Sequence, residues 1–151
     1  MAKLEILNKK KVKEIINQIK TQWGCDFSPD FVYLRNPKGK IYIINRDIEK
    51  IDTAQLKIDS VGMYFANLKD EKIRLSIEGS QLVGPKANKN IVELNEKQKE
   101  EWLRGEDIEK QTNCSGFVII KHKNDYMGCG KIKEERILNF YPKTRRIIHQ
   151  T

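Results

Sequence analysis

The chain has 151 residues, of which 38% are hydrophobic and 33% are charged. This length fits one ordinary domain or two small ones, and the periodic runs of apolar residues argue against a disordered chain. The formal net charge of +8 favours a polyanion, nucleic acid first, as the partner class. A surface that is merely rich in lysine is the alternative.

The cysteines and the apolar runs argue against a zinc protein, a membrane-spanning protein and a secreted protein. Cys25, Cys114 and Cys129 are widely spaced, and with the two histidines they form no zinc-binding pattern. We therefore predict free, buried or half-buried thiols and no metal or cofactor. No run approaches the roughly 18 apolar residues that span a bilayer, and the basic start lacks the apolar stretch of a signal peptide. We expect a cytoplasmic protein.

The first half of the chain predicts one helix followed by strands. Asn8 can cap a helix with a single apolar stripe that ends at Trp23, and Gly24 would stop it. The β-rich runs 31–35 and 40–45 flank "NPKG", which is typical of a hairpin.

Residues 54–77 predict three further short strands, with breaks near 59–60 and 69–70. A short helix or turn is expected over 78–83. Gly84-Pro85, followed by "KANKN", is the predicted boundary between an N-terminal domain (1–84) and a C-terminal domain (85–151).

The second half predicts a short helix within a mostly β unit. Residues 91–94 favour a strand, and Asn95 can cap a helix that Gly105 ends. A hairpin is predicted over 116–132 with its turn at Asn124-Asp125, and a last strand over 136–140.

Basic residues gather near the C-terminal end. Residues 131–146 hold six basic and two acidic side chains, whereas the helix before them is acidic. This polarity suits a directional binding face, although solvated lysines at a sheet edge also produce it.

Four segments of the second half carry a family resemblance. They are "WLRGEDI" (102–108), "GFVIIKH" (116–122), "MGCGKI" (127–132) and "LNFYPKTRR" (138–146). Together they resemble a PUA-type RNA-binding domain, in particular the PUA-like C-terminal region of the Fmu/Sun-type ribosomal RNA cytosine-5 methyltransferases. The resemblance covers most of residues 30–148 and is looser before about residue 54. It implies an α+β fold, with a mixed α/β pre-PUA domain followed by a small PUA-like β-barrel with a short helix.

The chain departs from those enzymes in the features that carry their chemistry. It has no Gly-rich cofactor loop after a strand, and each of its cysteines follows a glycine or an asparagine instead of a proline. We therefore expect a stand-alone, non-catalytic chain, an arrangement similar to that of small ribosome-biogenesis factors.

The predicted RNA-binding residues lie between 104 and 146. Gly128 and Gly130 mark a strand where another backbone comes close. The resemblance implies that this backbone is RNA, and a bulge that closes a small barrel is the alternative. The cations Lys131, Lys143, Arg145 and Arg146 suit phosphate, although a basic terminus can also serve only as a solubilising edge.

The remaining candidates each have a structural alternative. Tyr141 could stack on an unpaired base, but it alternates with Phe140 and one of the two is expected in the core. Asn139 suits a base edge or a sugar hydroxyl, or a turn cap. Arg104, next to Gly105, can clamp phosphate or pair with an acidic neighbour, and we favour the ion pair. His122 is expected to face solvent.

Three functions fit these patterns. The first is a non-catalytic protein that binds structured rRNA or tRNA in ribosome biogenesis or RNA modification, with a ribosome-assembly factor or a methyltransferase as a further partner. The second is the RNA-targeting subunit of a methyltransferase whose catalytic domain is a separate chain. The third is a protein-interaction scaffold. The lysines of the first helix could extend the RNA track or bind a protein partner; they are Lys9, Lys10, Lys11 and Lys13.

Overall fold

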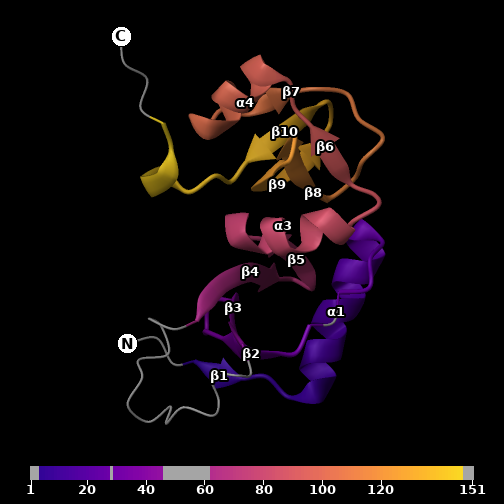
Figure 1. The fold of residues 1–151 in the computed structure, drawn as a ribbon, viewed down its shortest axis with the longest axis vertical. Helices are drawn as coiled ribbons and strands as arrows, with labels where there is room; N and C mark the ends of the chain where they lie inside the picture. The colour runs from indigo at the N-terminus through magenta and orange to yellow at the C-terminus, as the bar shows by residue number, and fades with distance from the viewer. Residues whose placement is uncertain (1–3, 28, 46–61, 148–151) are drawn as a thin grey trace.

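The computed structural model describes residues 4–27, 29–45 and 62–147, and it places one five-stranded sheet in each half of the chain (Figure 1). The first helix, α1 (Lys9–Trp23), forms as the sequence predicts. Asn8 Oδ1 accepts a hydrogen bond from the Lys11 amide at 2.9 Å, and Gly24 ends the helix in the left-handed region, with φ 71°. No helix of the described ranges is long and apolar enough to cross a membrane.

The N-terminal sheet is an antiparallel meander. Its strands are β1 (Glu5–Ile6), β2 (Phe31–Arg35), β3 (Lys40–Asn45), β4 (Met63–Lys69) and β5 (Lys72–Leu75), in that order across the sheet. The predicted hairpin is confirmed, and β4 and β5 confirm two of the three strands predicted within 54–77. The first of those three lies outside the described residues. Because consecutive strands alternate in direction, the turns at 36–39 and 70–71 lie at the same end of the sheet.

The next segment is the helix α3 (Ile77–Val83), which lies between the two sheets (Figure 1). The Ser76 hydroxyl caps it by accepting a hydrogen bond from the Gly79 amide at 2.9 Å. The predicted helix over 78–83 is thus confirmed, and a 3₁₀ turn over Gly84–Lys86 follows it.

The C-terminal sheet packs against the helix α4 (Glu96–Leu103). Its strands are β6 (Ile91–Glu93), β7 (Ile108–Glu109), β8 (Phe117–His122), β9 (Asp125–Lys133) and β10 (Arg136–Asn139). The strand order is β6-β8-β9-β10-β7, and β6 runs parallel to β8. Asn95 caps α4 as predicted. The β8–β9 turn falls at Lys123-Asn124, one residue earlier than the prediction.

This strand order describes an open, curled sheet rather than a closed barrel, since β6 and β7 lie at its two edges. The Lys110 ammonium group, just after β7, donates to the carbonyl of Glu93 in β6 at 2.8 Å, so a side chain bridges the edges. Trp102 is fully buried under the sheet and donates its indole N–H to the Met127 carbonyl at 2.9 Å. The α+β class is confirmed. The pre-PUA character of the first half and the division at 84/85 stay predictions.

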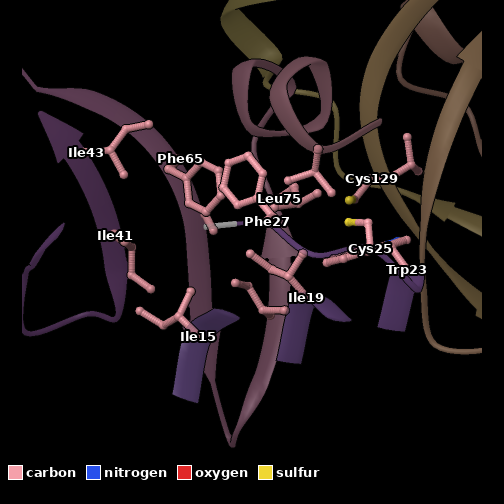
Figure 2. Packing of buried hydrophobic residues seen from close by; sticks show 14 of the residues in the cluster. Ile15, Ile19, Trp23, Cys25, Phe27, Ile41, Ile43, Phe65, Leu75 and Cys129 are labelled. Atoms are coloured by element: carbon pink, nitrogen blue, oxygen red, sulfur yellow. The ribbon is translucent and has the colours of Figure 1, made fainter. Parts of the chain in front are cut away.

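The two halves share one hydrophobic core (Figure 2). Ile119 of β8 and Cys129 of β9 belong to the same buried cluster as Trp23 and Phe27 from the N-terminal half. Val118 and Ile120 point to the other face of the C-terminal sheet, into a second cluster around Trp102. Because both faces of β8 are covered, its first four residues (117–120) form an uninterrupted apolar run.

Two small residues bring α3 close to both sheets. A side chain at Gly79 would collide with the Phe65 carbonyl of β4. On the other side, the fully buried Ser80 hydroxyl accepts a hydrogen bond from the Gly128 amide at 2.9 Å and donates to the Ile77 carbonyl at 2.6 Å. This hydroxyl is therefore a buried polar link between the halves.

Replacing Ser80 with alanine should destabilise the protein, because the Gly128 amide would be left buried without its acceptor. We expect the Ser80→Ala variant to lose about 1–3 kcal/mol of unfolding free energy, measured by urea denaturation. Ser115→Ala, at an exposed serine, is the matched control and should change it by less than about 0.5 kcal/mol. Equal stability of the two variants would contradict the role of Ser80.

The thiols are free, as predicted, with Cys25 and Cys129 buried and Cys114 half-buried. Burial raises the pKa of the Cys129 thiol to about 12. Burial, and then the nearby Asp26 carboxylate, also raise the pKa of Cys25. Neither buried thiol should therefore supply a reactive thiolate near neutral pH.

Thiol titration with an aromatic disulfide reagent at pH 8 should modify Cys114 alone in the native protein, and all the thiols after denaturation in urea. Cys114→Ser should abolish the rapid native reaction, because the remaining thiols are buried and protonated. A rapid reaction that persists in Cys114→Ser would show that Cys25 or Cys129 is accessible.

Candidate nucleic-acid interface

Asn139, a predicted RNA-binding residue, holds the segment after β10 against the end of α4. Its side-chain amide donates to the carbonyls of Trp102 at 2.9 Å and Glu106 at 2.8 Å. Its Oδ1 accepts from the Tyr141 amide at 2.7 Å. Both donors are in use, so this side chain acts as the turn cap that was its structural alternative.

Arg104, Gly105 and Arg146 lie in the same region. Arg104 pairs with Glu106 at 2.7 Å, which confirms the favoured ion pair. Arg146 donates its Nε–H to the Tyr141 carbonyl at 3.0 Å, and its side chain lies where a side chain at Gly105 would be. Gly105 adopts a φ of 90°, and its lack of a side chain lets Arg146 fold against α4. We call Arg104, Gly105, Asn139, Tyr141 and Arg146 the tail anchor.

Both glycines of "GCG" are buried against the protein's own side chains. A side chain at Gly130 would collide with Ile137 and approach Trp102. Gly128, with φ 93°, faces Ile77 of α3. The close approach that the sequence indicates therefore exists, and the neighbours are α3 and the core. Contact of these glycines with RNA stays a prediction.

The other predicted cations are more accessible. Lys143 is exposed in the 3₁₀ turn Lys143–Arg145. The side chain of Arg145 is 45% exposed and pairs with Glu78 at 2.6 Å. Lys131 lies with its ammonium 5.7 Å from the centre of the Phe117 ring. Lys131, Lys143 and Arg145 can therefore contact a bound anion without any change in the contacts of the tail anchor.

Of the two neighbouring aromatics, Phe140 is the exposed one. It is 37% exposed, whereas Tyr141 packs against the core cluster around Trp102. The prediction that one of the pair lies in the core fits this arrangement.

His122 does not face solvent, and that prediction is wrong. The residue is 6% exposed. Its Nδ1 lies 2.8 Å from the Leu94 carbonyl and its Nε2 lies 3.0 Å from Glu96 Oε2. The chain between β6 and α4 covers this position of β8, which the sequence of β8 alone does not indicate.

Two adjoining grooves lie where the sheets meet, and sequence reasoning missed most of their residues. The first, which we call the aromatic groove, has a volume of about 590 Å³. It lies between the N-terminal sheet and the residues that follow β10. Its aromatic and basic lining residues are Lys40, Tyr64, Arg74, Phe140, Tyr141 and Arg145.

The second, which we call the lysine groove, has a volume of about 940 Å³. The two turns at the same end of the N-terminal sheet line it, opposite Phe117, Lys131 and Phe140. Among its described lining residues a single acidic residue, Asp70, accompanies six basic ones, which are Arg35, Lys38, Lys69, Lys72, Arg74 and Lys131.

One signal in the sequence could have revealed this groove. "NPKGK" and "KDEK" are lysine-rich turns, and in an antiparallel meander alternate turns lie at the same end. What the sequence could not indicate is that this end faces β8 and β9 of the other sheet. In the described part of the chain no group of three or more His, Cys, Asp or Glu residues could hold a metal ion.

Comparison with known proteins bears on the C-terminal sheet and tail. Residues 89–147 match the family model of the methyltransferase RsmF PUA domain. The predicted PUA resemblance is confirmed. The matched residues contain the whole C-terminal sheet, α4 and the tail anchor.

Similarity to complete proteins extends beyond the PUA-like domain. A protein named ribosomal RNA small subunit methyltransferase F from Aeromonas salmonicida is 24% identical over 135 residues, which are 89% of this chain and 28% of the relative. The protein of the same name from Vibrio cholerae is 25% identical over 136 residues, with the same coverage. The chain thus spans little more than a quarter of the length of these relatives.

Replacing Asn139 with aspartate should release the tail of the PUA-like domain, because a carboxylate would face the two carbonyls that the amide now donates to. We expect trypsin to cleave after Lys143 and Arg145 about 5- to 30-fold faster, as for a local opening made easier by about 1–2 kcal/mol. Mass spectrometry of the fragments measures the rate. Asn124→Asp makes the same change in an exposed turn and should leave cleavage at these sites unchanged; equal rates in both variants would count against the anchor.

Proposed function

We propose that this chain binds structured RNA, ribosomal RNA first and transfer RNA as the alternative, and acts in rRNA modification or ribosome biogenesis without catalysing a reaction itself. The observation that carries the proposal is the match of residues 89–147 to the RsmF PUA domain. The relatives that align with this chain are named as ribosomal RNA methyltransferases, and that class of RNA is accordingly the proposed ligand. We also propose that the chain is a soluble protein of the cytoplasm, where ribosomal RNA lies.

The charge of the surface supports this proposal. Lys143 and Arg145 are exposed in the 3₁₀ turn after β10, and Lys131 lines the lysine groove beside basic residues of the N-terminal half. Contacts between such side chains and phosphate oxygens supply most of the affinity of nucleic-acid-binding proteins and position the nucleic acid. Arg145 suits this role because its planar guanidinium can meet two phosphate oxygens at once.

A second function follows from the names of the relatives. They are named as ribosomal RNA methyltransferases, and in this second proposal the chain presents RNA to a methyltransferase domain supplied by a separate chain. Co-purification of such an enzyme with the chain, and loss of its activity towards rRNA when the chain is removed, would distinguish this targeting role from simple binding. A ribosome-assembly factor is the other proposed protein partner.

The salt dependence of RNA affinity tests the proposal at the exposed cations. Removing two phosphate contacts with Lys143→Gln and Arg145→Gln should make the slope of log affinity against log salt shallower by roughly 1.4, at about 0.7 for each contact. Fluorescence anisotropy with a labelled rRNA hairpin, from low to moderate salt, measures the slope. Arg146 is left intact because it holds the Tyr141 carbonyl.

The matched control removes the same charge from α1, on the other side of the molecule in Figure 1. Lys9 and Lys10 are exposed there, and the double variant Lys9→Gln, Lys10→Gln should keep the wild-type slope. If instead the slope becomes shallower only in the Lys9, Lys10 variant, the RNA-binding site would lie on α1. No RNA binding by the wild-type chain would refute the proposed function and favour the protein-interaction scaffold.

A further inference from the structure

We propose that the aromatic groove and the lysine groove form one track for an unpaired, single-stranded segment of RNA, with bases on Phe140 and Tyr64 and phosphates on the basic residues between them. The inference rests on the proposed function and deepens it. It names the kind of RNA segment that is bound and adds the N-terminal half of the chain to the binding surface.

The two grooves adjoin, because two residues line both of them. Arg74 of β5 and Phe140, just after β10, line both of them. The remaining walls come from both halves of the chain, with Tyr64 on one side and Tyr141 on the other side of the aromatic groove. A ligand that follows this track contacts both sheets at once.

Three aromatic rings of the track each lie beside a cation. The Arg74 guanidinium lies 4.5 Å from the centre of the Phe140 ring. The Lys40 and Lys131 ammonium groups lie 5.4 Å and 5.7 Å from the centres of the Tyr64 and Phe117 rings. The combination of aromatic rings with positive charge is the one by which proteins bind single-stranded nucleic acid, because every base has a face that can stack and every nucleotide a phosphate.

Phe140 is the centre of the track. Its ring packs on Phe117, with the centroids 6.1 Å apart, and on Arg74, yet 37% of the residue remains exposed. An exposed ring beside a cation fits a ligand that carries both flat rings and negative charge. Bases in a duplex are already stacked on one another, so they are not available to this ring.

The charge of the lysine groove fits the phosphates of such a segment. Arg35, Lys72 and Arg74 line it from the N-terminal sheet. In the aromatic groove Glu78 is already paired with Arg145, which reduces its repulsion of a phosphate.

The test compares the affinity for one RNA sequence as a single strand and as a duplex. The probe is a labelled, unstructured strand of about ten nucleotides, which is within the usual range of site sizes. Fluorescence anisotropy measures binding of this strand alone and of the same strand in a duplex. We expect the wild type to prefer the single strand. Phe140→Leu removes the ring and keeps an apolar contact with Phe117, and it should weaken single-strand binding about 5- to 100-fold with little effect on the duplex. Phe140→Tyr keeps the ring and should bind as the wild type does.

Two further measurements keep the outcome interpretable. Urea denaturation checks that Phe140→Leu is folded, and if it is not, Tyr64→Leu replaces it in the comparison. Heparin is a polyanion without bases, and its affinity should be the same for the wild type and Phe140→Leu.

The inference is overturned if the wild type prefers the duplex, if Phe140→Leu and Tyr64→Leu bind the single strand normally, or if heparin binding falls by the same factor as RNA binding. In those cases RNA binding that depends on Lys143 and Arg145 would still support the proposed function. Failure of the wild type to bind RNA in any form would refute both.

Discussion

The packing of α3 between the two sheets is the constraint on which the rest of the structure depends. Gly79 lets the helix approach β4, and Ser80 on the adjacent position satisfies the buried amide of Gly128 in β9. The same contact region continues into a core that contains residues of both halves. A groove with one wall on each sheet keeps its shape only if the sheets keep their positions, and these contacts hold them there.

This constraint explains why the fold needs the two glycines of "MGCGKI", whether or not they contact a ligand. In a left-handed conformation Gly128 presents its amide to Ser80, and Gly130 leaves room for Ile137 and Trp102. Glycines in a strand mark close approach, and here the approaching groups are a helix and the core.

The basic residues of the C-terminal end divide into two kinds. Arg104 is paired with Glu106, and Arg146 donates to the Tyr141 carbonyl, so both act in positioning the segment that carries Phe140 and Arg145. Lys143 and Lys131 remain available, and the N-terminal half supplies further cations at the same place. Net charge counts both kinds equally, because it contains no information on which charges are already paired.

The sequence by itself determined the features that depend on residues close together in the chain. The caps Asn8 and Asn95, the stop at Gly24 and the hairpin turns were predicted because their signals are hydrogen bonds and backbone angles within a few residues. The tertiary structure alone decided which partners distant residues meet. It buried His122, used Asn139 for the tail anchor, left Phe140 exposed in place of Tyr141, and placed the lysine-rich turns of the first half beside β8 and β9. The physical reason is that burial and charge pairing depend on which surfaces come together, and here α3 and the shared core decide it.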